Sequence, residues 1–85
     1  MTKKEISESL RAFLTNELLV EFDSGVNDDT DLFDAGLVDS YGFIELIGFI
    51  ESKHSVVFTD DELMESSMNT LNALSDLVMK KHESR

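Results

Sequence analysis

The sequence predicts an all-α fold, a four-helix bundle with three longer helices and one short third helix. Apolar residues recur at three- and four-residue intervals in three separate stretches, and residues suited to capping a helix precede these stretches. No proline interrupts them, and 41% of the 85 residues are hydrophobic, which is enough for one small core. We therefore expect one domain over residues 1–85, with a frayed tail at residues 82–85.

The first helix is expected from about residue 3 to about residue 19. Thr2 and Glu5 have the spacing of a capping box, in which each side chain satisfies a free backbone N–H group. The opposite face of this helix is charged and should be solvated. The predicted buried stripe consists of Ile6, Leu10, Phe13, Leu14 and Leu18.

A long loop is expected over residues 20–38, because the hydrophobic period is lost there and glycines and aspartates accumulate. Loops of this length in small domains are often functional. An EF-hand register that starts at Asn27 would need glycine and glutamate where Leu32 and Val38 stand, so a solvated acidic loop is the better interpretation. The residues expected to hold the loop against the core are Val26, Leu32, Phe33 and Leu37.

The second helix is expected from about residue 40 to residue 53. Asp39 directly precedes it, and its carboxylate is suited to accept from the free N–H groups of the first turn. We interpret His54 as an ordinary residue at the helix end. The residues expected to be buried are Phe43, Leu46, Ile47 and Ile50.

Two further helices are expected beyond an extended apolar link of Val56, Val57 and Phe58. A second capping-box spacing, between Thr59 and Glu62, predicts a short third helix over about residues 60–65. Met64 and Met68 are expected to fill irregular core space. Asn69 or Thr70 should cap the last helix, whose predicted inward residues are Leu71, Leu74, Leu77 and Val78.

The formal net charge of −11 excludes several classes of partner. Nucleic acid and anionic membrane surfaces are not expected, because phosphate binding needs clustered lysine and arginine. Basic protein surfaces are the expected partners. The chain contains no cysteine, no apolar run of membrane-spanning length and no recognisable targeting segment, so we expect a monomeric cytoplasmic protein.

Asp39 and Ser40, preceded by Leu37 and followed by Phe43, Ile44, Glu45 and Leu46, resemble the attachment site of acyl, aminoacyl and peptidyl carrier proteins. The resemblance covers nearly the whole chain, and the run 33–40 followed by Gly42 is similar to freestanding D-alanyl carriers and specialised acyl carriers. It implies a bundle of acyl-carrier type, with 4′-phosphopantetheine attached to Ser40 and supported by Asp39. A phosphopantetheinyl transferase would supply this group from CoA. Its thiol would carry a cargo as a thioester.

The implied function is that of a carrier in lipid metabolism, such as fatty acid biosynthesis, or of an aminoacyl carrier. Its partners would be ligases, synthases or transferases with a basic docking patch, and the second helix is the family's usual docking surface. Glu45 is assigned to docking, whereas for Glu51 docking and plain solvation are equally supported. Tyr41 stands where the family often has leucine, and Tyr41 and Phe49 both lie off the buried stripe. We expect both aromatic side chains to contact partners.

Two other functions compete with the carrier hypothesis. A hydrolase elbow would need glycine where Val38 stands; the available histidine bases are His54 and His82, and an aspartate or glutamate base stays open. Because so small a chain leaves no length to build a pocket, we expect no enzymatic activity. A small acidic interaction domain without a prosthetic group would explain the bundle and the charge equally well. It gives no reason for Asp39 and Ser40 to begin a helix after a long loop.

Overall fold

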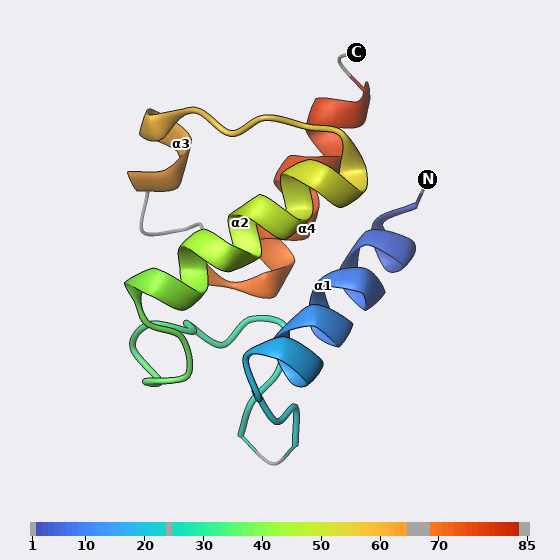
Figure 1. Cartoon of the computed structure of the whole chain (residues 1–85). Helices are drawn as coiled ribbons and strands as arrows, with labels where there is room; N and C mark the ends of the chain where they lie inside the picture. Colours follow the sequence, from blue (N-terminus) through green and yellow to red (C-terminus); the bar gives the residue numbers. More distant parts are fainter. Residues whose placement is uncertain (1, 24, 65–68, 84–85) are drawn as a thin grey trace.

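The computed structural model describes residues 2–23, 25–64 and 69–83, and it confirms the all-helical architecture. The described residues form α1 (Lys3–Glu17), α2 (Ser40–His54), α3 (Asp60–Met64) and α4 (Leu71–Glu83). α1 packs against both α4 and α2. Both termini lie at one end of the bundle and the long loop before α2 lies at the other, with α3 set to one side (Figure 1). Ser40 therefore begins α2 at the loop end.

The core contains one face of each longer helix, as the hydrophobic spacing predicted. Phe13, Leu18 and Leu77 are only partly buried, at the edge of this core. Leu32 of the loop and Val56 and Phe58 of the link are also buried. The predicted helical residues that are buried are Ile6, Leu10, Leu14, Phe43, Leu46, Ile47, Ile50, Leu71, Leu74 and Val78.

The predicted capping residues form the expected hydrogen bonds. The Glu5 N–H donates to Thr2 Oγ1 at 3.2 Å, and the Thr2 N–H donates to Glu5 Oε1 at 3.2 Å. The same reciprocal pair links Thr59 and Glu62 at the start of α3, at 2.8 and 3.2 Å. Thr70 caps α4, since its Oγ1 accepts from the Ala73 N–H at 3.0 Å. Local sequence alone thus predicted where α1, α3 and α4 begin.

α1 ends two residues before the predicted end. Leu18 is the C-cap, and Leu19 adopts the left-handed conformation with φ of 59° and is 80% exposed. This reversal lets the Val20 N–H donate to the Leu14 carbonyl at 2.9 Å and places Val20 in the core. Burial of Val20 therefore offsets the cost of a left-handed leucine, which no periodic pattern could show.

The loop is fastened to α4 and α1 by hydrogen bonds and an ion pair. The Leu32 N–H donates to the Asn69 carbonyl and the Asn72 N–H to the Asp28 carbonyl, both at 2.9 Å. Asp28 also pairs with Arg11 of α1. Asp31 Oδ1 accepts from the backbone N–H groups of residues 33 and 34. Several loop aspartates thus have structural partners, which hold the described part of the loop in place.

One prediction about an individual side chain is wrong. Met64 is 83% exposed rather than part of the core, because the neighbouring Leu63 is the α3 residue that packs against the core. His54 ends α2, as interpreted from the sequence, and it is buried, with 4% of its surface exposed. Met68 and the predicted last residue of the third helix, Glu65, lie outside the described residues. No helix among the described residues is long and apolar enough to cross a membrane.

Candidate functional site

Asp39 fixes the start of α2 and with it the position of Ser40. Its backbone is extended, and its Oδ1 accepts from the Gly42 N–H at 2.7 Å. The Asp39 carbonyl accepts from the Phe43 N–H at 2.9 Å, which begins the helical hydrogen bonds. Asp39 is therefore the predicted N-cap, and Ser40 is the first residue of the helix. The Ser40 side chain is exposed to solvent.

Two glycines, Gly36 and Gly42, bring the loop close to this first turn, and their structural roles are not visible in the sequence. Gly36 has φ of 71°, in the left-handed region that favours glycine, and the loop turns there toward Asp39. A Cβ at Gly42 would lie 3.3 Å from Asp39 Oδ1, 3.5 Å from Val38 Cγ1 and 3.6 Å from Leu18 Cδ1. The missing side chain of Gly42 thus allows the loop to pack against the helix start.

The start of α2 suits a phosphate ester. A helix of 15 residues presents the positive end of its dipole and its free N–H groups at Ser40. A hollow of about 360 Å³ adjoins the turn, and Glu17, Leu19, Asp39, Tyr41 and Glu45 are among its lining residues. Ser40 is thus exposed beside this hollow. Negative charge surrounds it.

The four predicted docking residues do not have equivalent surroundings. Tyr41 is 73% exposed and Glu45 is also exposed. The Phe49 ring is half-buried and stacks on Phe13 of α1, with centroids 4.5 Å apart. Glu51 is half-buried, and its Oε2 accepts from the backbone N–H of the buried residue 58 at 3.0 Å. Phe49 and Glu51 therefore help to pack the bundle, and docking by any of the four stays a prediction.

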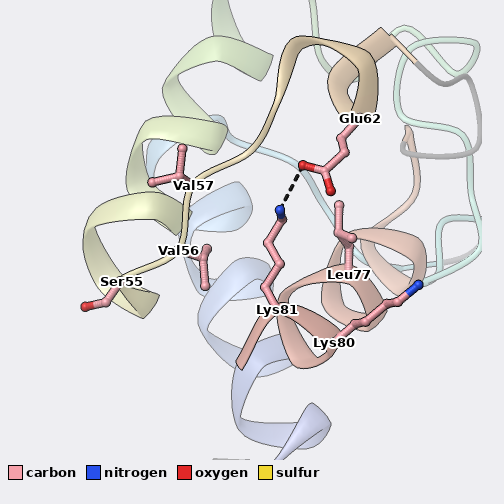
Figure 2. A pocket seen from close by; sticks show the side chains of 7 residues that line it. All are labelled: Ser55, Val56, Val57, Glu62, Leu77, Lys80 and Lys81. Carbon is pink, nitrogen blue, oxygen red and sulfur yellow. Dashed lines mark ion pairs between the residues drawn. The ribbon is translucent and has the colours of Figure 1, made fainter. Parts of the chain in front are cut away.

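A second hollow, of about 400 Å³, lies where the link after α2 passes α3 and the end of α4. Figure 2 shows Lys81 of α4 reaching Glu62 of α3, and these side chains form an ion pair at 2.8 Å. The hydrogen bond from Lys81, and after it the one from the Thr59 backbone, hold the pKa of Glu62 below its ordinary value. Lys81 also lies over the Phe58 ring. These contacts attach α3 to α4, and Ser40 is not among the residues that line the hollow.

His54 has a structural environment that the sequence did not reveal. Its Nε2 lies 2.8 Å from Ser9 Oγ, and Ser9 donates its proton to the Ile6 carbonyl at 2.8 Å. The His54 and His82 rings meet edge to face, with centroids 6.3 Å apart. Burial, then His82 and Lys53, lower the pKa of His54. Because 14 residues separate it from Ser40, about 21 Å along the helix axis, His54 is not a base for Ser40.

Comparison with known proteins gives consistent results. The sequence profile of the family described as phosphopantetheine attachment site matches residues 10–78. The D-alanyl carrier protein of Streptococcus suis (strain 05ZYH33) is 38% identical over 61 residues, which is 72% of this chain and 76% of that protein. The D-alanyl carrier protein of Streptococcus thermophilus (strain ATCC BAA-491 / LMD-9) is similar to the same extent.

Proposed function

Because the chain belongs to the phosphopantetheine attachment-site family, whose members bear covalent 4′-phosphopantetheine, we propose that it is a carrier protein modified at Ser40. The observation that carries the assignment is the exposed serine at the start of α2, directly after the N-cap Asp39. The matched range contains this turn and both of its neighbouring glycines.

The residues present fit the chemistry of attachment. The Ser40 oxygen would form the new bond to phosphorus and lose its proton to the transferase, while the rest of CoA leaves. Asp39 would hold the helix start rigid, and the helix dipole would favour the resulting phosphodiester. When bound, the prosthetic group supplies the thiol for a thioester. The chain, which has no cysteine, supplies none.

The protein itself would catalyse no reaction. His54 ends the helix that Ser40 begins, and it is buried beside Ser9. We propose that the chain acts as a stand-alone monomer in the cytoplasm and presents its cargo to enzymes with basic surfaces. Exposed Tyr41 and Glu45 would form part of the docking surface. Phe49 and Glu51 would add the accessible edges of side chains that also pack the bundle.

Intact mass tests the attachment. After incubation with CoA and a broad-specificity transferase, the wild type should gain the mass of one phosphopantetheinyl group. Ser40→Ala should stay folded and gain nothing. Ser52→Ala is a matched control, because it makes the same change at another exposed serine of α2, and it should be modified as the wild type is. An unmodified wild type would instead favour an acidic interaction domain without a prosthetic group.

The relatives favour an amino acid as cargo over a fatty acyl chain. Two relatives at 38% identity are named D-alanyl carrier proteins. We therefore propose D-alanine as the first cargo to test. The phosphopantetheinylated protein would be incubated with ATP, D-alanine and a ligase that charges a streptococcal D-alanyl carrier. A thioester that hydroxylamine releases would support this cargo. Loading only by an acyl ligase with fatty acid would overturn it and leave the carrier function intact.

A further inference from the structure

Gly48 lies in the middle of α2 at an exposed position, and the fold gives no reason for a glycine there. Gly25 and Gly36 have positive φ, and Gly42 allows a close approach, whereas a Cβ at Gly48 would meet nothing within 4 Å. Glycine inside a helix is less favourable than every residue except proline. A contact with another molecule would explain why the side chain is absent.

The surface around Gly48 is a shallow hollow with an apolar floor. It measures about 360 Å³, and we call it the Gly48 socket. Ile44, one turn before Gly48, is 70% exposed, which is unusual for isoleucine. Glu51 lines the socket, and Glu45 lies three residues before Gly48 on the same helix, so the acidic rim consists of the Glu51 carboxylate with that of Glu45 nearby. The socket is lined by Phe43, Ile44, Ile47, Gly48, Glu51 and Leu63.

The position of the socket relates it to an enzyme that acts on Ser40. Ser40 precedes Gly48 by eight residues on α2, about 12 Å along the helix axis. An interface of standard size covers about 800 Å² of each partner, which is large enough to include both Ser40 and Gly48. CoA carries several phosphate charges, so an enzyme that binds it has basic residues around its site. This charge complements the acidic rim.

We propose that the Gly48 socket receives a bulky apolar side chain, flanked by lysine or arginine, from the phosphopantetheinyl transferase. This proposal rests on the proposed function, because that function requires such an enzyme. A bulky apolar side chain would fill the hollow that the missing Cβ leaves, as interface anchors do. The neighbouring cation would pair with Glu45 or Glu51.

The test compares transfer rates and thermal stability for Gly48→Ala, Gly48→Leu and the wild type. Without a partner, both substitutions should raise Tm, by about 4 °C or more for alanine, because they replace a glycine at an open helical position. With the transferase, Gly48→Leu should lower kcat/KM about tenfold or more through KM, and Gly48→Ala by less. Thr15→Leu is the matched control, since it adds leucine at an exposed position of α1, and its rate should equal that of the wild type.

Two results would overturn the proposal that the transferase occupies the Gly48 socket. One is a folded Gly48→Leu protein that is modified with wild-type kcat/KM. The other is a fall in kcat with unchanged KM, because an occluded docking site should weaken binding. The proposed function has a separate readout, the identity of the modified serine. A product modified at a residue other than Ser40 would contradict the proposed attachment site, whatever the relative transfer rates of the Gly48 variants and the wild type.

Discussion

Ile47 and Ile44 lie three residues apart on α2, and truncating each to alanine should give very different losses of stability. Ile47 is 7% exposed and Ile44 is 70% exposed. Both substitutions remove the same three carbon groups and change helix propensity equally, so the difference between them isolates burial. At about 0.8 kcal/mol for each buried group, Ile47→Ala should lose about 2.4 kcal/mol, and the cavity left behind raises the loss to about 3 kcal/mol.

Ile44→Ala should lower the free energy of unfolding by less than about 1 kcal/mol, since most of the Ile44 side chain is already in water. The free energy of unfolding of a whole domain is about 5–15 kcal/mol, so the loss from Ile47→Ala is a large fraction of it. For a domain of this size, that loss should lower Tm by about 12–24 °C. The assay is urea unfolding of the wild type and both variants, with equal m-values as the sign that the denatured states are alike. Equal losses at the two positions would refute the orientation of α2, and with it the placement of the Gly48 socket.

Three other predictions concern docking and pH. Tyr41→Leu should leave modification of Ser40 intact but slow loading by the dedicated ligase, because the exposed ring and its hydroxyl are lost; a loading assay with unchanged rate would make Tyr41 a plain surface residue. Glu45→Lys should slow reaction with a basic partner at low salt, and the difference from the wild type should shrink as salt screens charges beyond about 8–10 Å; equal rates at low salt would remove Glu45 from the docking surface. Since the pKa of His54 is lowered by burial, then by His82 and Lys53, the folded state takes up its proton less readily than the unfolded state. The stability that neutral His54 contributes should be complete above the ordinary histidine pKa of about 6.5 and decline as pH falls below it through the lowered pKa, so wild type should lose stability relative to His54→Gln as pH is lowered below about 6.5; parallel curves for the two proteins would contradict this.

The helices and the N-cap that begins α2 could be predicted because their signals are local. The capping boxes at Thr2 and Thr59 and the N-cap Asp39 involve residues three apart, and the buried stripes follow one helical period. The first residue of α2 was therefore predicted correctly. Ser40 as the attachment residue, by contrast, stays a proposal that the mass experiment tests.

Features that depend on distant partners could not be predicted. The burial of His54 depends on Ser9, 45 positions earlier, and on His82 of α4. Met64 is exposed because the neighbouring Leu63 is the α3 residue that packs against the core, which the apolar character of methionine does not show. Glu51 was compared only as a docking or solvated residue, yet it accepts a hydrogen bond from the link after α2. Each case required knowing which elements meet in space.

The structural roles of the glycines near the site could not be predicted from the sequence. Gly36, Gly42 and Gly48 look alike in the sequence, but one permits a left-handed turn, one a close approach, and one leaves open space. Only the backbone conformation and the surroundings of a Cβ distinguish them. Gly48 has neither a left-handed backbone nor a close neighbour that would require glycine, and this difference led to the Gly48 socket.

The central claim, attachment of phosphopantetheine at Ser40, is tested most directly by locating the modified residue. The wild type would be treated with transferase and CoA, digested, and the labelled peptide fragmented by tandem mass spectrometry. We expect a single label on Ser40, in a peptide that contains Asp39 and Tyr41. A label on any other serine, or a wild type that acquires no label from transferases that modify a control carrier, would contradict the account.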